Sequence, residues 1–253
     1  MKFATALAML VVCATTARAD DLVSGLSQDQ IQITSNYTGS DLVVFGAIEQ
    51  DSESDQSLTG KRDVVVVVRG PDTKMDVRRK QRIAGIWINN RKVTLSGMPS
   101  YYFVASTQPL SKIAQEETLE RYQIGLDNVA PQSATTHKVS TTEQFRQAIV
   151  RERMRGQVYS QAPGGVEFLS NSLFRVHVPV PADAPRGQYS AQVFLFRDGD
   201  VVSAQSTPLF VDQTGLERRL YNTAHNQPLL YGLATVLMAV LMGWLSSLIF
   251  RQT

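Results

Sequence analysis

The feature that most constrains this chain is an uncharged apolar run near its C-terminal end. Residues 229–250 read LLYGLATVLMAVLMGWLSSLIF, 22 residues without a charge. At about 1.5 Å per residue, a helix of this length spans the ~30 Å hydrocarbon core of a bilayer. Pro228 precedes the run, and Tyr231 and Trp244 lie toward its two ends, where interfacial aromatic residues are common. The sequence therefore predicts a single transmembrane helix at residues 228–250.

The N-terminal end predicts a secretory signal at residues 1–19. An apolar run follows Lys2, and Ala17-Arg18-Ala19 forms a small-x-small cleavage site. The run is too short to cross a bilayer. A cleaved signal sends the body across the membrane and makes residues 251–253 a cytoplasmic tail, which in a bacterium predicts an inner-membrane protein with a periplasmic body. If the signal is false, the competing topology is a tail-anchored protein with a cytoplasmic body.

Removal of the signal changes the charge and the cysteine content. The loss of Lys2 and Arg18 reduces the 25 basic residues to 23, equal to the 23 acidic residues. A neutral chain outside the cytoplasm gives no reason to expect nucleic-acid binding. Cys13 is the only cysteine, so a mature chain without it has no disulfide, no catalytic thiol and no thiolate metal site.

The body divides by pattern into three parts. Short strand patterns fill residues 20–108 and 161–214, and residues 109–160 form a mainly helical insertion or linker. A juxtamembrane segment at 215–227 joins the body to the transmembrane helix. The predicted fold class is mainly β: an immunoglobulin-like β-sandwich body, as one or two sandwiches, with a helical insertion and the C-terminal transmembrane helix.

Local patterns place several elements within this plan. Five consecutive valines at residues 63–69 predict a buried strand, and helices are expected at 109–120 and 141–155. Asp198-Gly199 predicts a tight hairpin turn, and Asn89-Asn90 predicts another.

No catalytic constellation is evident. His137, His177 and His225 are far apart, and neither a metal nor a cofactor is expected. No nucleophile elbow, phosphate loop or dinucleotide fingerprint occurs. Carboxylates are plentiful, so a membrane-anchored envelope hydrolase that uses a pair of them is an alternative to a non-enzymatic binding protein.

Charge is distributed unevenly along the first half of the body. Residues 41–60 contain five acids and no base, whereas residues 61–92 contain ten bases and three acids. A basic patch would suit anionic lipid head groups, an acidic partner, or an anion sensed in the periplasm. The simpler interpretation, which we favour from the sequence, is that the acidic loop at 51–60 neutralises the basic strands. The candidate patch comprises Arg78, Arg79, Lys80 and Arg82.

The transmembrane segment has a candidate contact face. Small residues recur at successive i, i+4 positions, which places them on one side of a helix, and close approach of backbones stabilises helix pairs in lipid. This predicts packing against a second copy or a multi-pass partner; the alternative is chance in a helix rich in small residues. The four positions are Thr235, Ala239, Gly243 and Ser247.

Several runs are similar to an uncharacterised family of alphaproteobacterial transmembrane proteins. They are SNYTGSDLVVFGAIE, DVVVVVRGP, RRKQRIAGIWIN, FLFRDGDVVSAQSTPLFV and the tail HNQPLLYGLATVLMAVLMGWL. The resemblance implies a cell-envelope location and an association with sulfite-exporter-like permeases, and it brings no catalytic residues. We therefore expect a non-enzymatic, membrane-anchored periplasmic protein that binds or assembles with an envelope partner such as a transporter.

Overall fold

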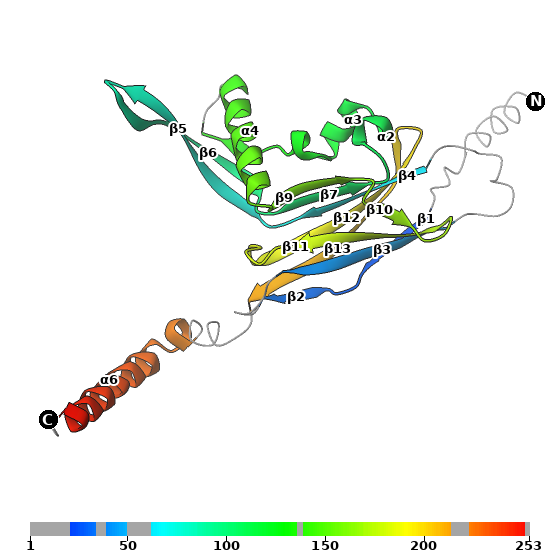
Figure 1. Cartoon of the computed structure of the whole chain (residues 1–253). Coiled ribbons are helices and arrows are strands. Elements are labelled where there is room, and N and C mark those ends of the chain that lie inside the picture. The colour runs from blue at the N-terminus through cyan, green and yellow to red at the C-terminus, as the bar shows by residue number, and fades with distance from the viewer. Residues whose placement is uncertain (1–20, 34–38, 50–61, 136–138, 214–222, 251–253) are drawn as a thin grey trace, which may run out of the picture.

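The computed structural model describes residues 21–33, 39–49, 62–135, 139–213 and 223–250. The predicted signal at 1–19, the acidic loop at 51–60, His137 and the tail at 251–253 lie outside these residues. The described chain is mainly β and ends in one long helix (Figure 1). The mainly β prediction is therefore confirmed.

One sheet of the body contains four antiparallel strands in the order β1-β3-β11-β10. Side chains alternate strictly along β11, where Phe174, Val176 and Val178 are fully buried and His177 is exposed. This alternation is typical of a sheet with one face on the core and one face on solvent. The strands are β1 (Asp21–Leu26), β3 (Ser40–Glu49), β11 (Leu173–Val180) and β10 (Val166–Phe168).

The second sheet contains six strands in the order β2-β13-β12-β4-β7-β9. Strand β4 lies in its middle, paired with β12 and β7, and its five valines are at most 3% exposed. The predicted buried strand is thus confirmed. Strands β2 and β9 pair in parallel with β13 and β7. The strands are β2 (Gln30–Ile33), β4 (Arg62–Arg69), β7 (Tyr102–Ser106), β9 (Tyr159–Pro163), β12 (Gly187–Arg197) and β13 (Asp200–Gln213).

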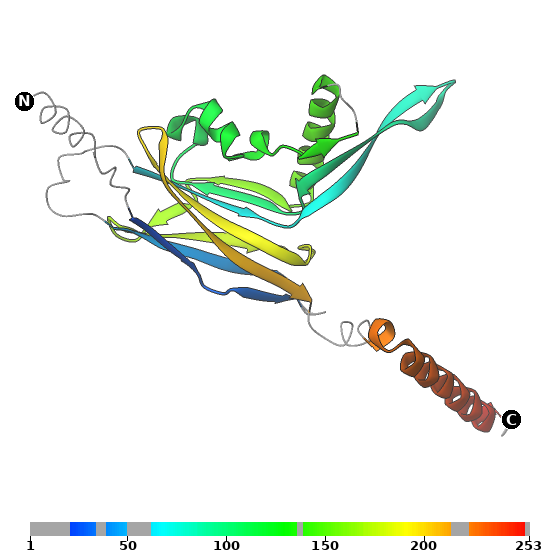
Figure 2. The same ribbon diagram turned by 180° about the vertical axis from the view of Figure 1, so that it is seen from behind.

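The two sheets lie in separate layers, and the helices that follow β7 cover the outer side of the six-stranded sheet (Figures 1 and 2). Strands from both sides of the helical segment share each sheet, because β11 pairs with β3 and β12 pairs with β4. The two β parts therefore form one body. The intervening helices are α2 (Leu110–Ile113), α3 (Glu116–Arg121), the 3-10 helix η2 (Leu126–Asn128) and α4 (Val139–Arg155).

A long hairpin leaves this body at one end. Strand β5 (Asp72–Ile83) pairs with β6 (Ile86–Pro99), and the short strand β8 (Ser133–Ala134) adds to β6 near its base. The hairpin projects beyond both sheets in Figure 1.

The position of this hairpin corrects one prediction. The chain turns at Ala84-Gly85, not at Asn89-Asn90, and β6 continues through both asparagines. Ala84 and Gly85 have φ values of 50° and 85°, the left-handed pair that a two-residue hairpin turn of type I′ requires. The register skips Asn90, whose side-chain amide donates to Gln81 Oε1 at 2.7 Å. Asn90 is thus the extra, unpaired residue of a β-bulge. A bulge interrupts regular strand pairing as a turn does, which is why the same asparagine resembled a turn signal.

Of the remaining predictions about local structure, one is confirmed and one is partly wrong. The Asp198-Gly199 turn between β12 and β13 is confirmed. The helix expected at 109–120 is two short helices, α2 and α3, interrupted after Ile113. Strands β1 and β9 were not anticipated.

The last helix, α6 (Pro228–Phe250), is the one helix of the described chain that is long and apolar enough to cross a membrane. Its apolar window, Pro228–Ser247, buries nothing against the protein. A core helix of a soluble protein would bury this surface, so lipid is its expected environment.

Candidate functional site

The β5–β6 hairpin has two parts that differ in burial. At its base, Met75, Val93 and Leu95 are buried, and Val77 packs against the same core. Beyond Val77 the surroundings change completely, because every described side chain from Arg78 to Asn90 is exposed. We call residues 78–92 the arm.

The end of the arm is apolar. Ile83, Ile86, Trp87 and Ile88 are 45%, 68%, 66% and 42% exposed, and we call these four residues the apolar tip. In the register, Ile83 pairs with Ile86 and Arg82 pairs with Trp87. Directly paired residues share a face, so the isoleucines gather on one face of the arm and Trp87 lies on the other. Large apolar side chains gathered at an exposed position mark interaction sites more often than isolated ones do.

The predicted basic residues lie together on β5, directly behind the apolar tip. Arg78, Arg79, Lys80 and Arg82 follow one another along one strand, and we call them the basic stem. No carboxylate from the described residues forms an ion pair with any of them. Arg82 instead donates from Nε to the carbonyl oxygen of Gly85 at 3.2 Å, across the turn.

The acid nearest to the basic stem is already engaged. Asp76 pairs with Lys92 Nζ at 2.9 Å and accepts a hydrogen bond from the Thr94 hydroxyl at 2.5 Å. The Thr94 hydrogen bond and the ammonium of Lys92 lower the pKa of Asp76. This carboxylate stays ionised at neutral pH and pairs with Lys92, while Arg78 of the basic stem also contributes to its lowered pKa.

The acidic loop at 51–60 lies outside the described residues. Whether it neutralises the basic strands therefore stays a prediction.

The base of the arm is held firmly to the body. Arg69 forms an ion pair with Asp72 at 3.0 Å and donates to Gln123 Oε1 at 2.6 Å. Tyr159 Oη donates to the carbonyl oxygen of Pro99 at 2.5 Å, where β6 ends. These contacts fix both ends of the hairpin, so the direction of the arm is set by the fold.

Helix α4 lies beside the base of the hairpin. Arg146 is buried and donates from Nη1 to the carbonyl oxygens of Leu126 and Val129 at 3.4 and 3.3 Å. Its other nitrogens pair with Glu143 at 2.7 and 2.6 Å. A groove of about 490 Å³ lies between α4 and β5, lined by residues such as Met75, Ile149 and Arg153.

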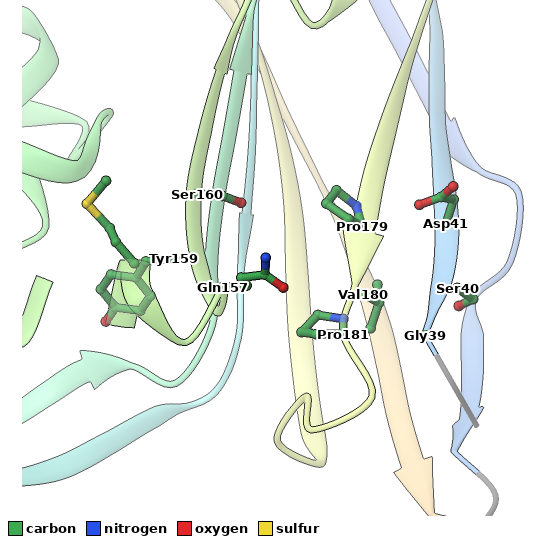
Figure 3. Close-up of a pocket in the computed structure, with 10 residues that line it drawn as sticks. Gly39, Ser40, Asp41, Gln157, Tyr159, Ser160, Pro179, Val180 and Pro181 are labelled. Atoms are coloured by element: carbon green, nitrogen blue, oxygen red, sulfur yellow. The ribbon is translucent and has the colours of Figure 1, made fainter. Parts of the chain in front are cut away.

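A cavity of about 510 Å³ lies at the opening between the two sheets. Figure 3 shows Gln157 and Ser160 on one side of it and Asp41 and Pro179 on the other. The Ser160 hydroxyl has no hydrogen-bond partner among the described residues. One carboxylate among neutral polar side chains can hold a small polar molecule, but a single carboxylate does not make an acid–base pair.

A smaller cavity of about 380 Å³ bears on the hydrolase alternative, because Asp63 and Asp198 both line it. Asp63 accepts hydrogen bonds on both oxygens, from the Thr107 hydroxyl at 2.6 Å and from Gln108 Nε2 at 2.7 Å. A carboxylate held in this way serves the fold. Among the described residues, no group of three or more His, Cys, Asp or Glu side chains could hold a metal ion.

The predicted helix face on α6 remains a prediction. Thr235, Ala239, Gly243 and Ser247 are all exposed, and a Cβ added at Gly243 would meet nothing within 4 Å. Thr235 Oγ1 donates within its own helix, to the carbonyl oxygens of Gly232 at 2.8 Å and Tyr231 at 3.1 Å. Its hydroxyl is thus satisfied locally and requires no partner helix.

The apolar tip was missed from the sequence. The run Ile83–Ile88 has the composition of a buried strand, and the turn was expected after it. The pair Ala84-Gly85 could have revealed the tip. It is a possible hairpin turn that has an isoleucine directly before it and another directly after it, and a run of basic residues further upstream.

Comparison with known families gives one match over most of the chain. The model of a family described as "Putative transmembrane protein (Alph_Pro_TM)" matches residues 21–252. No curated protein matches the sequence.

Proposed function

Because the chain belongs to the family described as "Putative transmembrane protein (Alph_Pro_TM)", we propose that it is a non-enzymatic protein of the bacterial cell envelope that assembles with a membrane partner. In this proposal residues 1–19 are removed as a signal, α6 crosses the inner membrane and the body lies in the periplasm. The partner is a multi-pass membrane protein, with permeases as the class that the sequence resemblance favours.

The observation that carries this proposal is the arm. The arm exposes Trp87 and three isoleucines to solvent on a two-stranded support. This exposure does not stabilise the isolated protein, so a binding partner is the expected reason for it. The arm projects from the end of the body at which β13 ends, in both Figure 1 and Figure 2. In this proposal the arm is the element that contacts the membrane partner.

We also propose that the body is immunoglobulin-like. The order β1-β3-β11-β10 in one sheet and β13-β12-β4-β7 in the other corresponds to the A-B-E-D and G-F-C-C′ orders of such domains. Tyr189, near the start of β12, donates from Oη to the carbonyl oxygen of Pro185 at 2.5 Å, as in the tyrosine corner of that fold. The intersheet disulfide of such domains joins strands B and F, which are β3 and β12 here. Buried Ala191, two residues after Tyr189, stands where its second cysteine would be.

Helix α6 contributes to assembly in this proposal through the face of Thr235, Ala239, Gly243 and Ser247. Small side chains allow two backbones to approach closely in lipid, where apolar burial by itself provides no drive.

Co-purification from native membranes tests the proposal. We expect the full-length tagged protein, extracted in mild detergent, to retain a multi-pass membrane protein identified by mass spectrometry. An Ile86→Ser/Trp87→Ser variant should lose it at least tenfold, the size of effect expected when central anchors are removed. A Val23→Ser/Phe210→Ser variant is the matched control, because both residues are about half exposed on the body.

Two outcomes would count against the proposal. Recovery of no membrane protein above an untagged strain would overturn it, and equal recovery with all three proteins would remove the arm from it. Ala239→Leu/Gly243→Leu tests the helix separately, and unchanged recovery with that variant would eliminate the contribution of α6.

A further inference from the structure

The arm combines two properties that rarely occur together on a protein surface. Its end carries the four exposed apolar residues of the tip, and the sequence between Val77 and Val93 contains six basic residues and no acid. We propose that the arm binds the anionic surface of the same membrane that holds α6. The apolar tip enters the bilayer interface, and the basic stem contacts anionic head groups. This inference rests on the proposed function, which holds the body beside the membrane.

The spacing along the arm fits the layers of a bilayer surface. The tip residues occupy the first three cross-strand pairs after the turn, from Ile83–Ile86 to Gln81–Ile88. At about 3.4 Å per pair this is roughly 10 Å, which matches the 5–10 Å to which interfacial elements enter the head-group and acyl boundary. Lys80, Arg79 and Arg78 follow immediately behind, at the depth of lipid phosphates.

The residue types also fit an interface. Tryptophan concentrates at the boundary between lipid and water because its ring is both large and polar at one edge. Arg82, paired with Trp87 in the register, has a long stem that lets its guanidinium extend from an apolar surface to the head groups. An anionic bilayer presents a negative surface directly above an apolar interior, which is the order in which the basic stem and the apolar tip follow one another along the arm.

The position of the anchor brings the arm within reach of lipid. Strand β13, which ends at Gln213, ends on the same side of the body as the arm (Figures 1 and 2). The 14 residues from 214 to 227 separate it from Pro228, and such a segment spans at most about 50 Å. An anchored body is therefore confined near the membrane, where even a weak lipid contact is populated because the surface concentration is high.

A second copy of the chain is a poorer occupant of the arm. Two arms meeting tip to tip would bring two basic stems together, and like charges at short range repel. An exposed strand that carries several bases also resists edge-to-edge pairing. Negative lipid head groups relieve the same repulsion, so charge favours lipid over self-association.

The protein contains its own reporter for this contact. It has only two tryptophans, Trp87 and Trp244, so Trp244→Phe leaves Trp87 as the sole one. We would place this full-length protein in nanodiscs at one molecule per disc, in phosphatidylcholine alone or with phosphatidylglycerol. Bromine-labelled lipids then report contact with the bilayer, and acrylamide reports contact with water.

We expect bromolipid quenching of Trp87 in the phosphatidylglycerol discs, weaker quenching in phosphatidylcholine, and loss of the difference in high salt. Each base near an anionic surface contributes about fivefold to binding. Replacing Arg78, Arg79, Lys80 and Arg82 by Gln should therefore reduce the ratio of lipid-bound to free tip at least tenfold. The matched control replaces four exposed bases of the body, Lys112, Arg121, Arg151 and Arg155, and should retain the contact.

Three results would overturn the inference. The first is that acrylamide quenches Trp87 equally in both lipids while bromolipids do not quench it. The second is quenching that survives loss of the basic stem, and the third is protection from acrylamide only when several copies share a disc, which indicates a second copy as the occupant. The discs contain no other protein, so the quenching result is independent of co-purification. Lipid binding can fail while the membrane partner is still recovered, and the partner can be lost while lipid binding persists.

Discussion

Two apolar segments of this chain are similar in composition and opposite in environment. The valines of β4 lie between two neighbouring strands and are at most 3% exposed. Ile83, Ile86, Trp87 and Ile88 have equal or greater apolar surface, yet they are 42–68% exposed at the end of the arm. Both segments consist of good strand formers, so neither propensity nor hydrophobicity separates them.

The difference lies in what each strand has beside it and beneath it. Strand β4 has a paired strand on both edges and a layer on each face, whereas beyond Val77 strand β5 has only β6. A two-stranded ribbon has no second layer that could cover its side chains. Apolar residues of the body are covered and contribute to stability, whereas those of the arm are exposed and serve contact in our proposal. Mutations should therefore affect the two segments differently.

The largest contrast is expected from a carboxylate placed in each segment. Val66→Asp would bury an unpaired charge in the centre of the six-stranded sheet and should destabilise the protein by more than about 3 kcal/mol, enough to prevent folding. Ile86→Asp should change stability by less than about 0.5 kcal/mol, because its side chain is already in solvent. Denaturant unfolding in detergent measures both. Comparable losses would mean that the tip is part of the core.

A second contrast concerns basic residues. Arg146→Met keeps the apolar stem but leaves the buried carbonyl oxygens of Leu126 and Val129 without their donor. A loss of about 1–3 kcal/mol is expected in thermal or denaturant unfolding. Arg79→Met on the arm removes the same charge from solvent and should stay within about 0.5 kcal/mol. If Arg79→Met proved the more damaging, the basic stem would have a role in stability.

A third change tests whether the arm unfolds separately from the body. Gly85 has φ of +85°, and Val there should weaken the turn by about 1 kcal/mol. We expect faster hydrogen exchange in the arm and an unchanged midpoint of global unfolding, because the arm packs on nothing beyond Val77. Ala84→Asn should act in the opposite direction, since Asn tolerates the left-handed conformation better than Ala. A shifted global midpoint would show that the arm and the body unfold together.

The smallest effect is a pH dependence at α4. The hydrogen bond from Arg146, followed by that from Gln147, lowers the pKa of Glu143. A lowered pKa stabilises the fold above the unfolded-state value near 4.5, and this contribution disappears as the pH falls through the folded-state pKa. Because Glu143 is partly exposed, Glu143→Gln should cost only about 0.5 kcal/mol at pH 7, and this cost should shrink as the pH falls through the folded-state pKa.

Asp76→Asn provides the comparison for that measurement. Its pKa is lowered as well, by Thr94 and Lys92, but the group is fully exposed. Its replacement should leave no measurable pH dependence of unfolding. A larger effect at Asp76 than at Glu143 would mean that solvent screens the base of the arm less than its exposure indicates.

Local pattern predicted the regular parts of the fold well. The five valines of β4 and the turn at Asp198-Gly199 each have one physical interpretation, and the structure has them as expected. The uncharged run of α6 is similar, because its length and composition allow few alternatives.

The remaining features depend on contacts that sequence spacing does not contain. Strand β9 is held by a parallel pairing with β7 across the helical segment, and Asn90 could form a turn or a bulge until the partner strand fixes the register. The basic stem was identified from charge alone. Its apolar tip was not, because whether Ile86 and Trp87 are covered depends on where neighbouring strands end.

The parallel pairing of β2 with β13 has a consequence for biosynthesis. Strand β13 joins β2 to the rest of its sheet, and only residues 214–227 separate it from α6. Strand β2 therefore cannot pair until β13, some 180 residues later in the chain, has been made. Pairing over such a separation is slow to form, so the six-stranded sheet is completed at about the time when α6 leaves the ribosome. Completion of the sheet and membrane attachment through α6 therefore coincide late in biosynthesis.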